Sequence, residues 1–326
     1  MAVPRPGGRI LGVSLGCGRK GGGVIVPAVQ RKRRSLRWRE QWEAWLFLAP
    51  NLAGFLVFTV FAVVFSLWIS LHEWDLFNPP VFVGLANYAK LLTQDESFRR
   101  ALRNTVYFTL GIVPLGTAVS LVLALLVNRA VKGMTFFRTA LYLPSVSSTI
   151  AIGIVWVWLL DPQFGLVNWF LRTIGIAHPP DWLNSTTWAK PALILMDVWK
   201  SAGYYMVIFL AGLQGIPEQL YEAALIDGAT PWRKFWSITL PLLSPTIFFV
   251  LVMRIIGVFN MFELPYIMTR GGPAGSTESM VFYIYKNAFE WFQMGYAAAI
   301  AWVLFLIIFA VTYVQFRYQG RWVTYD

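Results

Sequence analysis

Cysteine, histidine and charged residues are all scarce in this chain of 326 residues. Its one cysteine, Cys17, cannot form an internal disulfide, and its two histidines, His72 and His178, do not have the spacing of metal ligands. The sequence also lacks GxSxG, HExxH and paired-carboxylate patterns, and the phosphate-binding pattern GxxxxGK[S/T] is missing. We therefore expect no metal site, no catalytic residues and no bound nucleotide in this chain, which argues against an enzyme.

Charged residues make up 13% of the chain, against about 25% in an ordinary soluble domain, while apolar residues make up 57%. A bilayer core about 30 Å thick requires roughly 20 apolar residues per crossing helix. The sequence therefore predicts an all-α, polytopic membrane bundle. Its six transmembrane helices are expected at residues 43–71, 104–127, 137–160, 189–212, 242–268 and 294–316.

The formal net charge of +11 could indicate a nucleic-acid partner, but its distribution fits membrane orientation better. Residues 1–40 contain ten Lys or Arg residues and one acid, Glu40. We expect these residues to form a basic, largely disordered cytoplasmic tail before a membrane domain at 41–326. The loop after the second span is also basic, so both termini and the segment at 213–241 are expected in the cytoplasm, and no nucleic-acid partner is expected.

The segment at 217–240 is polar and helix-prone although it lies between two apolar runs. Pro217 at a first helical position favours a helix start, and Gly228 suits a left-handed cap after Asp227. Thr230 and Pro231 repeat the start signal. A second helix is expected to stop before Pro241, where the fifth span begins. The residues alone allow either a solvated loop or an element that docks in a groove of another protein.

A resemblance favours the second alternative. YEAALIDGATPWRKFWSITLPLL, residues 221–243, closely resembles the EAA signature of permease subunits in binding-protein-dependent ABC importers. TRGGPAGST at 269–277 and the sequence that follows it are similar to the carbohydrate branch of that family. The match extends over roughly residues 43–316 and implies the type I importer (MetI-like) permease fold in a bacterial or archaeal cytoplasmic membrane.

The resemblance also implies an assembly. Its expected members are a second related permease, two ABC ATPase subunits that hold ATP and Mg, an extracytoplasmic solute-binding protein and the surrounding lipid. This chain would form half of an alternating-access pathway for a sugar, with a di- or oligosaccharide expected. A phosphorylated polyol or another solute remains an alternative, as does a stand-alone secondary carrier. The residues implied in ATPase coupling are Glu222, Ala223, Ala224, Asp227, Gly228 and Pro241.

The solute site is expected in the fourth and fifth spans, because ionisable groups inside a membrane are costly and often functional. Asp197, Lys200, Ser201 and Tyr204 follow i, i+3, i+4, i+7 spacing and share a helix face. Arg254 is expected near mid-membrane. Resemblance to maltose-type permeases places sugar contacts at Asp197, Lys200, Ser201, Tyr204, Arg254, Gly257, Val258 and Met261. The alternative is a structural charge network that joins Asp197 to Lys200 or Arg254.

Overall fold

The computed structural model describes residues 30–129 and 131–323, with side chains from residue 41 onward. The described chain is helical apart from one short antiparallel pair of strands, β1 (His72–Glu73) and β2 (Val81–Phe82). This confirms the predicted all-α class. The disorder expected for the tail at 1–40 stays a prediction, because residues 1–29 lie outside the described residues. Residues 30–40 form the start of the first helix.

The described residues divide into two compact units, one that ends at residue 61 and one that starts at residue 62. In the first unit, α1 (Gln30–Gly54) continues into a π-helical turn, η1 (Phe55–Val60). Its large apolar side chains are exposed in the isolated chain, as at Phe47 and Phe58. Exposed apolar side chains of this kind are expected where a helix contacts lipid or another subunit instead of its own core.

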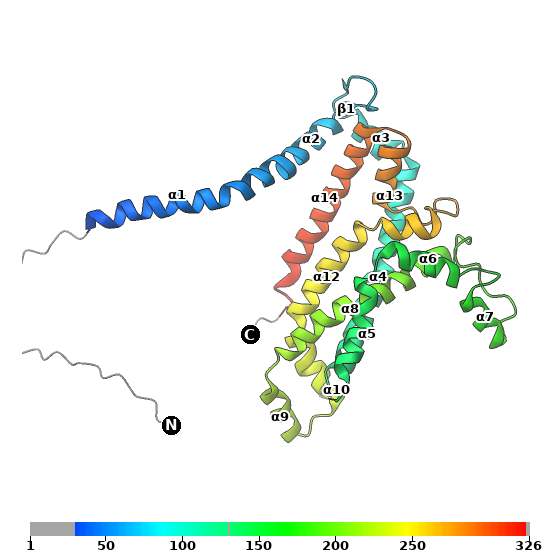
Figure 1. Ribbon diagram of the computed structural model, residues 1–326. Coiled ribbons are helices and arrows are strands. Elements are labelled where there is room, and N and C mark those ends of the chain that lie inside the picture. Colours follow the sequence, from blue (N-terminus) through cyan, green and yellow to red (C-terminus); the bar gives the residue numbers. More distant parts are fainter. Residues whose placement is uncertain (1–29, 130, 324–326) are drawn as a thin grey trace, which may run out of the picture. The chain divides into compact units, whose positions relative to one another are not determined.

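The second unit contains the remaining helices, drawn in Figure 1. The longer ones are α2 (Phe61–Ser70), α3 (Ala86–Thr93), α4 (Glu96–Val127), α5 (Met134–Val146), α6 (Thr149–Leu159), α7 (Leu166–Thr173), α8 (Ala189–Gln214), α12 (Ser244–Phe259) and α14 (Met294–Gln319). Three shorter elements, η3 (Pro265–Thr269), α13 (Met280–Tyr285) and η4 (Lys286–Glu290), connect α12 to α14.

Up to six membrane spans are present among the described residues, in agreement with the predicted number. Four are helices long and apolar enough to cross alone, at Gln41–Ser70, Glu96–Val127, Ala189–Gln214 and Met294–Gln319. The other two are bent pairs: Met134–Val146 with Thr149–Leu159, at 95°, and Pro231–Leu242 with Ser244–Phe259, at 65°.

The helix that contains the predicted second span, 104–127, begins eight residues before Asn104. The helix α4 begins at Glu96, because the Asp95 carboxylate caps it by accepting a hydrogen bond from the Phe98 N–H at 2.8 Å. Residues 96–103 therefore belong to the same helix as the span.

The third span is broken where the sequence predicted one continuous helix at 137–160. Ser147 has extended backbone angles, and α5 ends before it. The Ser147 hydroxyl donates at 3.0 Å to the carbonyl of Leu143. Serine side chains that satisfy nearby carbonyls offer the backbone an alternative to the helix. The pair α5 and α6 is consequently bent.

The fifth span was predicted to reach residue 268, but α12 ends at Phe259. Pro265 has no N–H to donate to the Met261 carbonyl four residues earlier. The Ser279 hydroxyl donates to that carbonyl instead, at 2.5 Å. The break is thus stabilised by a residue from the following connection, which local sequence patterns do not show.

The core of the second unit is packed between α4, α8 and α12. Buried side chains such as Phe108, Leu193 and Met196 form one apolar cluster there, and Phe209, Leu243 and Val250 belong to a second one. Gly203 lets α8 approach α5, because a Cβ at this position would overlap the Leu141 carbonyl oxygen and lie 2.8 Å from the Tyr142 Cα. Backbone of α5 thus occupies the space that a side chain would need.

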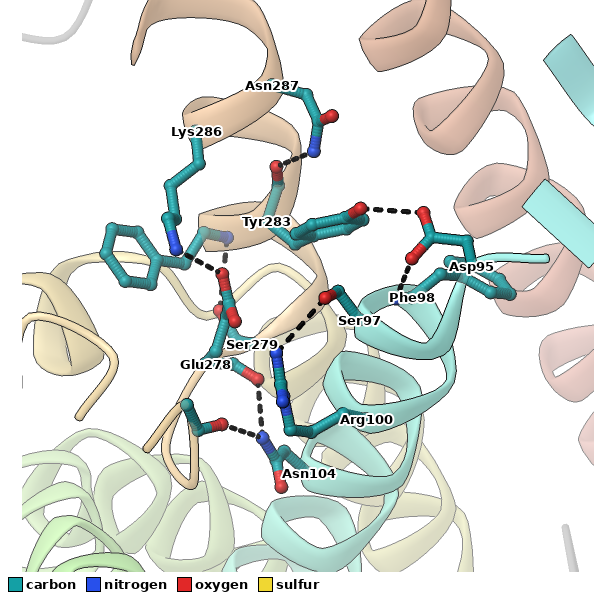
Figure 2. Close-up of polar contacts among 12 residues, drawn as sticks. Asp95, Ser97, Phe98, Arg100, Asn104, Glu278, Ser279, Tyr283, Lys286 and Asn287 are labelled. Atoms are coloured by element: carbon teal, nitrogen blue, oxygen red, sulfur yellow. Dashed lines mark hydrogen bonds and ion pairs between the residues drawn. The ribbon is translucent and has the colours of Figure 1, made fainter. Parts of the chain in front are cut away.

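A polar cluster joins the start of α4 to the connection before α14 (Figure 2). The Asp95 carboxylate accepts hydrogen bonds from the hydroxyls of Tyr283 at 2.6 Å and Tyr296 at 2.5 Å. The Asn104 amide donates to the carbonyls of Gly275 and Glu278, both at 2.9 Å. Three segments that are distant in sequence are fixed together at this end of the bundle.

We predict that Gly203→Ala destabilises the protein by the upper end of the roughly 1–3 kcal/mol typical of overpacking, because the added methyl meets backbone atoms of α5 that cannot rotate away. Thermal unfolding in detergent measures the loss. The control is Gly54→Ala, where the Cβ has no neighbour within 4 Å and the melting temperature should stay equal or rise slightly. Equal melting temperatures for wild type and Gly203→Ala would contradict the packing described.

The Asp95 cluster predicts a pH dependence of stability. Burial pulls the pKa of Asp95 upward, but hydrogen bonds from Tyr283, Tyr296 and the Phe98 N–H outweigh it and leave the pKa below the ordinary value of 3.8. A lowered folded pKa adds stability above pH 3.8 that is lost as the pH falls through the folded pKa.

Asp95→Asn should therefore melt below wild type at pH 7, and the difference should shrink as the pH falls below about 4. Glu96→Gln changes an exposed neighbouring acid and should leave the melting temperature nearly unchanged at both pH values. A difference for Asp95→Asn that is the same at pH 7 and pH 3 would rule out this account.

Candidate functional site

The segment predicted as a coupling element is a helical hairpin between α8 and α12. It consists of α9 (Glu218–Ile226), α10 (Pro231–Lys234), a π-helical turn η2 (Phe235–Thr239) and α11 (Leu240–Leu242). Pro217 was predicted at the first helical position, but it is the N-cap of α9 with ψ 128°. Its extended backbone turns the chain from α8 into the hairpin.

The turn of the hairpin follows the prediction. Gly228 has φ +71°, the left-handed conformation that glycine adopts without a steric penalty. The next N–H, that of Ala229, donates to the Ala224 carbonyl at 2.9 Å and closes the end of α9. The Thr230 side chain caps α10 by accepting from the Arg233 N–H, and Pro231 is the first residue of α10.

The second helix was predicted to end before Pro241, and that prediction was wrong. In an α-helix a proline ring clashes with the carbonyl four residues earlier. Here the π-helical turn η2 precedes Pro241, with the Leu240 N–H donating to the Phe235 carbonyl. The helix therefore passes through Pro241 in α11 and bends only at Leu243, before α12.

The hairpin presents an apolar surface to the solvent of the isolated chain. Ile226 is 86% exposed, Trp232 71% and Leu225 66%. Glu222, Ala223 and Asp227, which the sequence placed in the coupling set, are exposed as well. Inside the hairpin, the hydroxyls of Tyr221 and Thr239 lie 3.0 Å apart and join α9 to η2. The element is thus internally fastened and has an apolar face available to a partner.

A polar cavity of about 320 Å³ lies between α8, the start of α6 and the end of α12. Five of the eight residues predicted to contact solute line it: Asp197, Lys200, Ser201, Gly257 and Met261. Sequence reasoning did not assign Thr149, Asn260, Phe262, Glu263 and Leu264 to this site, although they complete the lining.

Two other residues predicted to contact solute, Tyr204 and Val258, do not line the cavity. Tyr204 is 43% exposed, with its ring against Tyr205, and does not line the cavity. Val258 is 5% exposed and belongs to the apolar core with Met261. Met261 contributes to both the core and the cavity lining.

Arg254 is buried behind the cavity, with 2% of its surface exposed. Its guanidinium donates to the Gly116 carbonyl at 2.8 Å, to the Ser120 hydroxyl at 2.7 Å and to the Ser201 hydroxyl at 3.2 Å. The guanidinium carbon also lies 3.9 Å from the centre of the Tyr205 ring, in cation–π geometry. Arg254 therefore connects α12 to α4 and α8, and these contacts fix the orientation of the charge.

The alternative charge network is not formed by direct ion pairs. Among the described residues, no salt bridge joins Asp197 to Lys200 or to Arg254. An ion pair does join Lys286 to Glu278, at 3.1 Å, in the connection before α14. Asp197 and Lys200 are thus available at the cavity, whereas the charge of Arg254 is solvated by neutral groups and an aromatic ring.

Comparisons with known proteins agree with this arrangement. The family described as "Binding-protein-dependent transport system inner membrane component" matches residues 112–324. The probable ABC transporter permease protein YesP of Bacillus subtilis is 39% identical over 299 residues, which is 91% of this chain and 96% of that protein. The trehalose/maltose transport system permease protein MalF of Thermococcus litoralis is 36% identical over 283 residues, 86% of this chain and 95% of that protein.

A crystal structure of a bacterial ABC transporter involved in the import of the acidic polysaccharide alginate contains a similar chain. The TM-score is 0.77 at 26% identity, with 89% of this chain and 99% of that chain covered. The family match extends over the bent third span, the hairpin, the cavity and α14. This chain belongs to the family of inner membrane components of binding-protein-dependent transport systems.

Proposed function

We propose that this chain is a permease subunit of an ATP-driven importer for a sugar, and that it forms half of the translocation pathway. The observation that carries the proposal is the direct attachment of an exposed helical hairpin, α9 to α11, to the two helices that line the polar cavity. The remaining members of the assembly would be a second permease, two ATPase subunits that bind ATP and Mg, and an extracytoplasmic solute-binding protein. Both termini would lie in the cytoplasm.

The exposed face of the hairpin supports docking onto an ATPase. Ile226 and Trp232 are large apolar side chains that α8 and α12 do not cover. A water-exposed apolar patch of this kind usually marks a protein interface. Because this chain has no phosphate-binding loop, the free energy of ATP hydrolysis must reach it through such an interface.

The charges of the cavity lining favour an uncharged sugar as the substrate over a phosphorylated polyol. Its charged lining residues are one cation, Lys200, and two acids, Asp197 and Glu263. Arg254 is not itself a lining residue, although it donates to the Ser201 hydroxyl, which does line the cavity. Carboxylate, amide and hydroxyl groups beside Phe262 provide hydrogen-bond partners and an apolar surface, which sugar recognition requires. Among the relatives, MalF of Thermococcus litoralis is named for trehalose and maltose, whereas UgpA of Yersinia pestis, 34% identical over 87% of this chain, is named for sn-glycerol-3-phosphate.

The docking proposal predicts that Ile226→Asp and Glu222→Ala lower uptake strongly and weaken retention of the ATPase subunits, while membrane insertion is unchanged. A charge at Ile226 would have to be desolvated on docking, at a cost of several kcal/mol if unpaired. Co-purification of the ATPase with the tagged permease measures the association. The control is Val131→Asp, another exposed apolar residue, in the loop between α4 and α5, which should retain the ATPase. Normal retention in both test variants would refute the assignment of the hairpin.

The cavity proposal predicts different effects for Asp197 and Arg254. Asp197→Asn should shift the sugar selectivity of stimulated ATP hydrolysis, because an acceptor for sugar hydroxyls is lost, with little change in melting temperature. Arg254→Lys should lower the melting temperature, because a lysine cannot satisfy three acceptors in the same geometry. The measurements are a carbohydrate screen of ATP hydrolysis in the complete assembly, and thermal unfolding. Unchanged selectivity in Asp197→Asn would indicate that the cavity is structural.

A further inference from the structure

The helix α7 carries a row of large apolar side chains that the described chain leaves exposed. Leu166, Trp169 and Phe170 form a stripe with i, i+3, i+4 spacing and are 50%, 64% and 57% exposed. Phe164 before the helix and Ile174 after it extend the stripe, at 78% and 59% exposed. Figure 1 shows α7 beyond α6, away from α12 and α14, so the rest of the described chain leaves this stripe uncovered.

One polar residue of α7, Asn168, faces the protein and is 1% exposed, whereas Arg172 and Thr173 are exposed. The Asn168 amide donates to the carbonyls of Pro162 and Pro180, and its side-chain oxygen accepts from the Trp182 indole N–H at 2.7 Å. Arg172 donates to the Pro162 carbonyl at 2.9 Å. These bonds fix the rotation of the helix, so the outward direction of the apolar stripe is built into the fold.

The helix α7 directly follows α6, the second helix of the bent pair counted as the third span. It follows α6 after a tight turn in which the Asp161 carboxylate accepts from the N–H groups of Gln163 and Phe164, both at 2.8 Å. The exposed apolar side chains of α6, including Ile154 at 60% and Trp158 at 55%, lead into the stripe. The apolar surface of a membrane-crossing pair therefore continues onto α7.

Tryptophan is concentrated in the same part of the chain. Five of its 16 tryptophans lie between residues 156 and 188: Trp156, Trp158, Trp169, Trp182 and Trp188. Tryptophan is enriched at the boundary between hydrocarbon and headgroups, where its ring is apolar and its N–H remains hydrogen-bonded. The stripe itself has no charged side chain and no side-chain amide, which favours lipid as its partner over a polar protein surface.

We propose that α7 lies in the plane of the membrane interface and inserts Leu166, Trp169 and Phe170 among the lipids of the leaflet opposite the α9–α11 hairpin. The side of the membrane follows from the chain, because the 26-residue helix α8 separates α7 from the hairpin. The bonds of Asn168 and Arg172 would then make α7 a lateral anchor for the connection between α6 and α8. The assignment does not depend on which solute is transported.

The single cysteine of the chain makes a labelling test direct. In a Cys17→Ala background, Leu166→Cys and Phe170→Cys carry nitroxide spin labels in the complete assembly, reconstituted into lipid nanodiscs. The control is Thr186→Cys, an exposed polar residue in the connection from α7 to α8. Collision rates with oxygen, which partitions into lipid, and with a water-soluble nickel chelate report the surroundings of each label.

We expect oxygen collisions to dominate at both stripe positions and nickel collisions to be several-fold lower there than at Thr186. Labels that are immobile and shielded from both reagents would show that another subunit covers the stripe. High nickel accessibility would show that the stripe is in water. Either result would overturn the proposal, provided that the labelled assemblies melt at the temperature of the Cys17→Ala parent.

Discussion

The arrangement of the second unit depends on the burial of one permanent charge, that of Arg254. A guanidinium inside a membrane bundle is costly unless its donors are satisfied. The Gly116 carbonyl, the Ser120 and Ser201 hydroxyls and the Tyr205 ring compensate the two terminal nitrogens, while the buried Nε has no hydrogen-bond partner among the described residues. A Cβ on Gly116 would lie 2.8 Å from the guanidinium carbon, so the glycine is needed for α4 to approach. The positions of α4, α8 and α12 are therefore coupled, and so is the α8 face that carries Asp197 and Lys200.

The sequence predicted the number of spans and their approximate positions because length and hydropathy determine both. It did not predict where those spans are interrupted. Such breaks require other groups to satisfy the freed backbone, as the Ser147 hydroxyl does for Leu143 and the Ser279 hydroxyl for Met261. The second of these partners is separated from its acceptor by a turn and a short helix. No window of local sequence contains the information that this oxygen and this carbonyl meet.

Part of the cavity lining could be predicted, because helical periodicity determines which residues share a face. Helical spacing places Asp197, Lys200 and Ser201 on one face within a little more than one turn, and all three line the cavity. Tyr204 shares that face, but it lies seven residues from Asp197, roughly 10 Å along the axis at 1.5 Å per residue. Periodicity gives the direction of a side chain and not the length of a cavity. Arg254 was predicted to contact the solute. In the structure its guanidinium donates to Gly116 and Ser120 of α4.

Packing at the base of the hairpin bears on how force would be transmitted in the proposed transport cycle. Leu243, where the helix bends into α12, is fully buried. A Cβ on Gly212 of α8 would lie 2.8 Å from the Leu243 side chain and 2.5 Å from the Thr246 hydroxyl. The ends of α8 and α12 nearest the hairpin are therefore in direct contact. Close-packed interiors have low compressibility and transmit strain. Displacement of α9 by an ATPase would consequently shift both helices together, and the contacts of Arg254 would carry that shift to α4 and to the cavity.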